Sequence, residues 1–343
     1  MAQNAVLREN RELLTYAHQF LLRPDRLLIV AGGLAVLALS LLAMQGLQWW
    51  ATNLLANFHL HLAVLGAAFV GLAVVWRRWL QAGIGAAIVV ANLGLVATQL
   101  PAQGAAVPPG EPQLRVMTVN VLFANQDVMA LRRALEEWLP DVVLLQEINQ
   151  RWKSDLAALR DIYPHQINVE KPLQLYDLHG TALISRLPIE EVMRRPLGGL
   201  GGRLTAARIA VGGRDVWLAS THLVKPSTPH GQRLQRVQLQ ELDAWAASIE
   251  APLIVGGDFN GTLHMQQIKT MVRDRGFSTD LRAGDWRQIA VGTYPAWLPG
   301  LGLKIDHVFV RGATISRSEI VDVPGSDHRG IQADIILARP EKS

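Results

Sequence analysis

The sequence predicts an α+β protein: a four-layer α/β/β/α sandwich, with two packed mixed sheets flanked by helices, preceded by three transmembrane helices. Two observations lead to this prediction. Half of the residues are apolar and only 18% are charged, which is a low share for one soluble body. After residue 112, many short β-branched runs are separated by a few long amphipathic stretches. That alternation indicates two sheets packed face to face with helices outside them.

Three uncharged segments occupy the first hundred residues, and each has about the 20 residues that a bilayer core requires. Buried helices of a soluble domain are the alternative, but no face of these segments is charged. A cleaved signal peptide is disfavoured because 26 residues precede the first segment and two further segments follow it. Tryptophans stand at the segment ends, as interfacial aromatics do. The predicted spans are 27–47, 54–76 and 79–100.

The basic residues predict how these spans are oriented. Arginines are frequent before the first span and form the turn Arg77–Arg78 between the second and third, whereas the connection QWWATN has none. The positive-inside rule therefore places the N-terminal segment 1–26 in the cytoplasm and everything after residue 100 outside.

A Pro/Gly/Ala-rich linker, 101–112, separates the spans from a second domain, 113–343. That domain holds 27 Lys and Arg against 25 Asp and Glu, a net charge of +2, without the clustered basic stripe typical of a duplex-DNA surface. The chain has no cysteine, which excludes a disulfide scaffold and a Cys-ligated metal.

The second domain alternates predicted strands with predicted helices. LRVMTVNV (114–121) alternates as a strand does, 128–139 has helical spacing and stops before Pro140, and 230–249 is the longest amphipathic helix. Further predicted strands are 141–148, 180–188, 205–211, 215–223, 252–260, 304–310 and 330–337.

Polar side chains capable of chemistry recur where these strands begin or end. In LIVGGDFNGT, two glycines follow a buried strand and let the backbone turn or approach another group closely, and Asp258 and Asn260 then point the same way. Each such residue alone fits an Asx turn, a solvated strand end or an ion pair. Together they predict one rim of one sandwich, formed by Asn120, Glu147, His222, Asp258, Asn260, Asp306 and Ser326–His328.

The chemistry open to this rim is narrow. Glu147 with Asn120, and with Asp327 as a further candidate, forms a hard oxygen site that suits Mg²⁺, with Mn²⁺ as the alternative. A zinc site is disfavoured because no H-E-x-x-H spacing occurs. The sequence also lacks a G-x-x-x-x-G-K-[ST] phosphate loop and a G-x-S-x-G nucleophile elbow. Metal-assisted attack of water on phosphorus is what remains.

The ordered motifs resemble those of the endonuclease/exonuclease/phosphatase superfamily, which includes nucleases, neutral sphingomyelinases and inositol polyphosphate phosphatases. The resemblance covers residues 113–339. With three spans ahead of it, the chain looks like the membrane-anchored bacterial members, which implies an inner-membrane protein with a periplasmic or extracellular catalytic domain. The matching segments are TVNV, LLQEI, HGTALISRLPI, STHL, GGDFNGT, KIDHVFV and SDHRGI.

The resemblance implies a role for each matching residue. Glu147 would be the main Mg²⁺ ligand, with Asn120 on metal or phosphate, and Asp327 would bind the metal directly or through water. Asp258 and Asn260 would position or deprotonate water and hold a phosphoryl oxygen. His328 would be a catalytic histidine oriented by Asp306, and His222 would stabilise the transition state or protonate the leaving oxygen. Whether the Asp or the His is the base stays open, and His307 is expected to be structural.

The motifs specify a reaction and leave the substrate open. The first expectation is a phosphoesterase or phosphodiesterase acting on lipid headgroups or envelope phosphates, with the bilayer and the ester as partners and no protein partner. The alternatives are a membrane-anchored nuclease that cleaves extracellular DNA or RNA, and an inert binding domain that keeps the fold. Four apolar residues between the predicted helix 230–249 and the last strand are expected to pack, or to meet bilayer or substrate: Trp286, Tyr294, Trp297 and Leu298.

Overall fold

A computed structural model describes residues 24–45, 49–99, 113–125, 127–168, 180–199, 202–284, 287–298 and 300–337. Most of the predicted cytoplasmic segment, the linker 101–112 and Trp286 lie outside these residues. The chain divides into two compact units. One unit contains the apolar helices α2, α4 and α5, and the other contains the short helix α3 and everything from β1 onward.

Two of the three predicted spans are found among the described residues. Two helical stretches are long and apolar enough to cross a membrane, Trp50–Val75 and Trp79–Ala97. The first predicted span corresponds to α2, of which only the apolar stretch Val30–Met44 has described side chains, so a third span is not shown. The predicted connection QWWATN is mostly helical, because its last four residues begin α3 and the stretch Trp50–Val75. The elements are α2 (Pro24–Met44), α3 (Trp50–Leu55), the 3₁₀ turn η1 (Ala56–Phe58), α4 (His59–Val75) and α5 (Trp79–Ala97).

Two six-stranded sheets form the framework of the second unit. Each is mixed, with one parallel pair, β1–β2 in the first sheet and β7–β8 in the second, while the remaining pairs are antiparallel. The first sheet has the order β11 (Thr314–Val321), β12 (Gly330–Ile336), β1 (Gln113–Asn120), β2 (Val142–Gln146), β4 (Thr181–Ser185), β3 (His165–Ile167). The second has the order β5 (Ile189–Leu197), β6 (Gly202–Val211), β7 (Arg214–His222), β8 (Leu253–Asp258), β10 (Asp306–Arg311), β9 (Ser278–Thr279).

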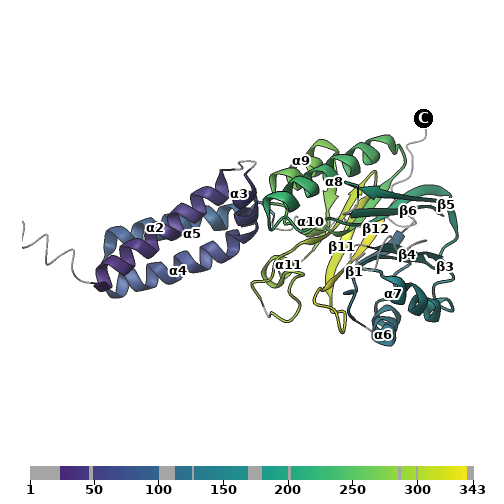
Figure 1. The fold of residues 1–343 in the computed structure, drawn as a ribbon, viewed down its shortest axis with the longest axis horizontal. Coiled ribbons are helices and arrows are strands. Elements are labelled where there is room, and N and C mark those ends of the chain that lie inside the picture. The colour runs from purple at the N-terminus through teal and green to yellow at the C-terminus, as the bar shows by residue number, and fades with distance from the viewer. Residues whose placement is uncertain are drawn as a thin grey trace, which may run out of the picture. The chain divides into compact units, whose positions relative to one another are not determined.

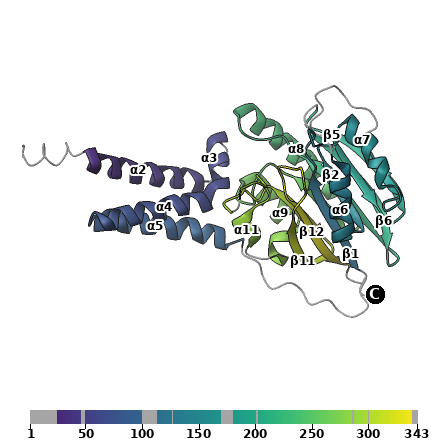
Figure 2. The same cartoon turned by 90° about the horizontal axis from the view of Figure 1, so that it is seen from below.

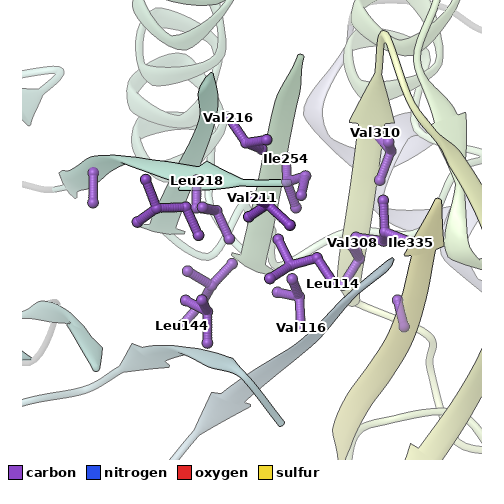
Figure 3. Packing of buried hydrophobic residues seen from close by; sticks show 14 of the residues in the cluster. Leu114, Val116, Leu144, Val211, Val216, Leu218, Ile254, Val308, Val310 and Ile335 are labelled. Atoms are coloured by element: carbon purple, nitrogen blue, oxygen red, sulfur yellow. The ribbon is translucent and has the colours of Figure 1, made fainter. Parts of the chain in front are cut away.

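The main core lies between the two sheets. Strand residues alternate across a sheet, so every second side chain of each inner strand points into this layer. Leu114 and Leu144 of the first sheet pack there with Leu218 and Ile254 of the second, and all four are fully buried (Figure 3).

Helices cover the outer faces of both sheets. The first sheet is covered by α6 (Val128–Trp138), α7 (Gln150–Asp155) and η2 (Leu156–Leu159), whose buried residues include Trp152. The second is covered by α8 (Pro229–Ser248) and α9 (Gln266–Asp274), where Trp245 packs. Figure 1 shows α8 and α9 on one side of the strands and α6 and α7 on the other, and Figure 2 looks onto the α6 side. Two short helices, α10 (Asp280–Ala283) and α11 (Arg287–Val291), precede β10. The predicted packing of two mixed sheets between helices is therefore confirmed.

Candidate active site

One edge of the sandwich collects the strand ends that carry the predicted site residues. β1 and β2 are parallel, as are β7 and β8, so in each sheet both strands end at the same edge. β10 and β12 run antiparallel to β8 and β1 and therefore begin at that edge. The residues on or beside these ends are Asn120, Glu147, His222, Asp258, Asp306 and His328.

Asp258 is the residue at which the hydrogen bonds of this edge meet. Its side chain is buried, and its Oδ1 accepts a hydrogen bond of 2.7 Å from the backbone N–H of Asn260. Its Oδ2 accepts one of 3.2 Å from the amide of Asn120 and lies 3.5 Å and 3.7 Å from the Nε2 atoms of His222 and His328. The two imidazoles therefore face one carboxylate.

Glu147 forms the other side of the site. The Asn120 amide also donates to its Oε1 at 3.0 Å, and the backbone N–H of Phe123 donates to its Oε2 at 2.9 Å. Asn120 thus bridges the carboxylates of Glu147 and Asp258. Glu147 has a φ of +62°, a backbone conformation that residues other than glycine rarely adopt and that is frequent at functional sites.

The geometry around His328 fixes the orientation of its ring. Its Nδ1 lies 2.9 Å from Oδ2 of Asp306, so that carboxylate accepts the Nδ1 hydrogen and leaves Nε2 directed toward Asp258. The hydroxyl of Ser326 donates to the carbonyl of Asn120 at 2.6 Å and accepts from the backbone N–H of His328 at 3.0 Å. This hydroxyl ties the loop before β12 to the end of β1.

His222 is held by Asn260. The side-chain nitrogen of Asn260 lies 3.3 Å from Nε2 of His222 and donates to the carbonyl of Leu223 at 2.9 Å. Asn260 has a φ of +49°, which asparagine tolerates better than most residues. The loop after β8 therefore presents Asp258 and Asn260 to the same imidazole, as the spacing of these two residues predicts.

Burial and neighbouring charges shift two pKa values in this group. Burial, together with the nearby Asp306 carboxylate, raises the pKa of Asp258 to about 7. Burial opposes the charge on His328, but the carboxylates of Asp306 and Asp258 outweigh it and raise the pKa of that imidazole to about 10. At neutral pH His328 is therefore an imidazolium, and Asp258 is divided between its carboxylate and carboxylic acid forms.

The two glycines before Asp258 let the sheets and strands approach closely. A Cβ on Gly256 would lie 2.6 Å from the side chain of Leu144 in the opposite sheet. A Cβ on Gly257 would lie 1.9 Å from the carbonyl oxygen of Thr221 on the neighbouring parallel strand. Both positions exclude larger residues, so the glycines allow β8 to carry Asp258 to this edge.

The other predicted site residues have distinct places. Asp327 precedes His328, and its carbonyl accepts from the backbone N–H of Ala296. Within the described residues its buried Oδ1 has no hydrogen-bond partner, and the side chain has no hydrogen bond to Asn120 or Glu147. His307 is fully buried and its Nε2 lies 2.9 Å from the carbonyl of Gly261, which fits the expected structural role.

Two further residues border the site: Thr293, which the sequence did not indicate, and Tyr294, which was expected to pack or to meet bilayer or substrate. The hydroxyl of Thr293 accepts from the backbone N–H groups of Ile305 and Asp306 at 3.1 and 3.2 Å, which fixes the start of β10. The ring of Tyr294 lies 4.8 Å, centroid to centroid, from the imidazole of His328. The only signal for them in the sequence is their place in the aromatic loop, where Trp297 is 76% exposed.

The most compact set of ligand-type groups among the described residues is Asp258, Asp306 and His328, whose donor atoms lie within 4.8 Å of one another. Within this set, Oδ2 of Asp306 lies 2.9 Å from Nδ1 of His328, so these two groups already pair with each other. Glu147 is half-buried and has no cationic partner among the described residues, and it supplies the hard oxygen that Mg²⁺ prefers.

The sequence profile of the Endonuclease/Exonuclease/phosphatase family matches residues 117–328, well over half of the chain. The chain belongs to this family. Members are metal-dependent hydrolases of phosphate esters, and the edge described above holds acidic and histidine groups that fit such chemistry. No curated protein sequence matches the chain.

Solved structures of the family share the fold. The endonuclease/exonuclease/phosphatase from Beutenbergia cavernae is 24% identical, with a TM-score of 0.54 over 66% of this chain and 72% of its own. The human Nocturnin catalytic domain with bound sulfate is 19% identical, with a TM-score of 0.52 over 65% and 94%. D. rerio TDP2 complexed with a single-strand DNA product is 17% identical, with a TM-score of 0.51 over 65% and 98%. At these identities the likeness extends to the fold alone.

Proposed function

We propose that this protein is a Mg²⁺-dependent phosphoesterase or phosphodiesterase that hydrolyses phosphate esters of membrane lipid headgroups, or other envelope phosphates, outside the cytoplasm. The observation that carries the reaction type is the convergence of two imidazoles on Asp258, with Glu147 on the other side of Asn120. A base, two hydrogen-bond donors and an oxygen ligand for a metal surround one small space. These are the groups that attack on phosphorus requires.

The residues divide the work as follows. Asp258, with a pKa of about 7, accepts the proton of the attacking water. The imidazolium of His328 donates to a phosphoryl oxygen, and Asp306 keeps its ring in place. His222 protonates the leaving oxygen or donates to it, while the Asn260 amide holds a phosphoryl oxygen. Mg²⁺ held by Glu147, with Asn120 and Asp327 near it, would draw charge from the phosphoryl oxygens when bound.

Lipid or envelope esters are favoured by the apolar helices. Trp50–Val75 and Trp79–Ala97 are long and apolar enough to span a bilayer, and the arginines flanking them favour an external second domain. An enzyme tethered in this way meets lipid headgroups at high local concentration. The near balance of charge in residues 113–343 also fits such a substrate better than duplex DNA.

A nuclease is the second candidate, because D. rerio TDP2 was solved with a single-strand DNA product and has this fold. In that case the substrate would be extracellular DNA or RNA, and activity would be sequence-blind and strongly dependent on salt.

The test is an activity panel with the full chain purified in detergent. Phospholipid vesicles, sphingomyelin, plasmid DNA, RNA and bis-p-nitrophenyl phosphate are each incubated with Mg²⁺, with Mn²⁺ and with EDTA. We expect metal-dependent hydrolysis of bis-p-nitrophenyl phosphate and of a lipid ester. Hydrolysis of nucleic acid alone would support the nuclease instead. Hydrolysis of no ester with either metal would indicate an inert binding domain.

A further inference from the structure

Tyr294 forms a fixed wall beside the catalytic imidazole of His328. Its ring lies 4.8 Å from the imidazole, with an angle of 42° between the planes. Its backbone is locked by reciprocal hydrogen bonds with Leu303, of 2.9 Å and 2.6 Å. Tyr294 is only half-buried, so part of this residue is exposed beside His328.

Lys225 places a positive charge next to the ring of Tyr294. Its ammonium nitrogen lies 5.4 Å from the centroid of the Tyr294 ring, within the range of a cation–π interaction. The side chain is exposed, and no carboxylate of the described residues lies within 4 Å of the ammonium. Its charge therefore lies over the Tyr294 ring and is not neutralised by an acidic neighbour among the described residues.

The backbone that carries Lys225 is also fixed. The segment runs from the end of β7, where His222 lies, to the start of α8 (Figure 1). The N–H of Val224 donates to the side chain of Gln238 at 2.8 Å. A Cβ on Gly231 would lie 2.5 Å from the carbonyl of Lys225, so this carbonyl packs directly on the first turn of α8.

The histidine side of the site carries a second cation by position. Arg203 on β6 is the antiparallel register partner of His222 on β7. Directly opposed residues of an antiparallel pair project from the same face of the sheet, so Arg203 shares the face of His222. The carboxylate of Glu147 lies at the opposite side, beside Asn120. Arg203 is thus a second cationic residue on the His222 side of the site.

We propose that Lys225 and Tyr294, with Arg203 beside His222, form a specificity subsite for a second anionic group, a phosphate on the alcohol part of the ester. This inference rests on the proposed function and adds a preference within it: esters whose alcohol carries a further phosphate are bound more tightly than esters without one. The tyrosine ring holds the ammonium in place, and the ammonium pairs with the added phosphate.

Binding is measured first, by calorimetry with the full chain in EDTA, so that no turnover is needed. Two matched pairs of ligands differ by one phosphate each: thymidine 5′-phosphate against thymidine 3′,5′-bisphosphate, and glycerophosphoinositol against its 4-phosphate. We expect the extra phosphate to tighten binding about three- to tenfold in at least one pair, and added salt to reduce this ratio. The pair that responds distinguishes a nucleotide source from a lipid-headgroup source.

The variants localise the effect. Lys225→Gln should bring the ratio of affinities within a ligand pair close to one, whereas Lys225→Arg should leave this ratio as in the wild type. Tyr294→Leu should lower the ratio more than Tyr294→Phe does, because the aromatic ring supports the cation. Lys269→Gln, at an exposed lysine of α9, is the matched control and should behave as the wild type.

Activity is then measured as hydrolysis of thymidine 5′-(p-nitrophenyl phosphate), with and without a 3′-phosphate. A wild-type protein that hydrolyses no ester of the activity panel and neither thymidine ester, while still showing the binding ratio, would contradict the proposed function but keep the subsite. Equal binding within both pairs, or a ratio that Lys225→Gln leaves unchanged, would overturn the subsite.

Discussion

At the scale of single residues, the division of charge decides which group acts as the base. His328 lies between the carboxylates of Asp306 and Asp258, and they hold its proton against the cost of burial. A protonated imidazole accepts no proton from water, so the proposed mechanism gives the role of base to Asp258, whose pKa of about 7 suits that task. The motifs alone leave this choice open, because both residue types are present and only their contacts distinguish them.

Glu147→Gln should reduce kcat/KM on bis-p-nitrophenyl phosphate by about a hundredfold or more, because one anionic ligand for the metal is lost. The change is nearly isosteric, and Phe123 can still donate to the remaining oxygen, so the circular dichroism spectrum should not change. The metal concentration for half-maximal activity should rise. Glu137→Gln, at an exposed glutamate of α6, is the control. Wild-type kcat/KM in the Glu147 variant would remove this residue from the metal site.

The two histidines should differ in their dependence on the leaving group. If His222 protonates the departing oxygen, His222→Ala should cost about 10²–10⁴ in kcat/KM on alkyl esters and far less on p-nitrophenyl esters. His328→Ala should impair both ester types alike, because His328 serves the phosphoryl oxygens. The measurement is kcat/KM for each variant on both types. Equal losses everywhere would make His222 a transition-state donor instead of an acid.

The chemically reactive residues of the site are easier to predict from the sequence than the residues that position them. Asp, Glu, His and Asn at strand ends stand out because few other groups perform this chemistry. Thr293 and Tyr294 contact neighbouring backbone and imidazole through a hydroxyl and a ring, and such residues are common in any loop. Only the folded chain shows that their partners belong to the site.

At the scale of elements, hydrophobic alternation identifies the inner strands and misses the edges. β1, β2, β4, β6, β7, β8, β10 and β12 all coincide with predicted strands. β5 (IEEVMRRPL) and β11 (TISRSEIV) were not predicted, because their exposed faces carry charged residues that break the apolar pattern. Register is likewise settled by packing, and it is register that pairs Asp258 with both Asp306 and His222.

A buried ion pair supports the start of β10. The ammonium of Lys304 lies 2.6 Å from Oδ2 of Asp280 and also donates to the carbonyl of Asp306. Nδ1 of His307 lies 3.9 Å from Oδ1 of Asp280. Burial, with the charge of Lys304, lowers the pKa of His307 to about 4. In the unfolded chain this pKa is near 6.5.

This lowered pKa makes stability depend on pH. Between pH 6.5 and 4 the unfolded chain binds a proton at His307 that the folded chain does not, so acid favours unfolding, by about 3 kcal/mol at pH 4. The His307→Gln variant should therefore lose less stability than the wild type between pH 7 and pH 4.5. The measurement is the urea midpoint of the full chain at each pH. His230→Gln, at an exposed histidine of α8, should retain the wild-type slope. The prediction fails if the His307 variant loses as much stability as the wild type.

At the scale of the whole molecule, composition separates the apolar unit from the rest but describes its helices incompletely. Its buried polar groups link three helices: Asn92 donates to Ser40 at 3.0 Å, and its Oδ1 lies 2.9 Å from Nδ1 of His59. Within a bilayer such bonds fix the helices against one another, because lipid tails cannot satisfy these groups. The hydropathy of the sequence detects the apolar runs and does not reveal this network.

Topology is the prediction that links the apolar unit to the proposed substrate. Arg77 and Arg78, in the turn between α4 and α5, predict a cytoplasmic turn, and α5 would then carry the chain outward. A C-terminal alkaline phosphatase fusion should be active, and a green fluorescent protein fusion should be dark. Fusions placed directly after Arg78 should show the opposite pattern, which controls for expression. An active phosphatase after Arg78, together with a fluorescent C-terminal fusion, would place the second unit in the cytoplasm. An extracellular lipid substrate would then be excluded, and cytoplasmic nucleic acid would be accessible.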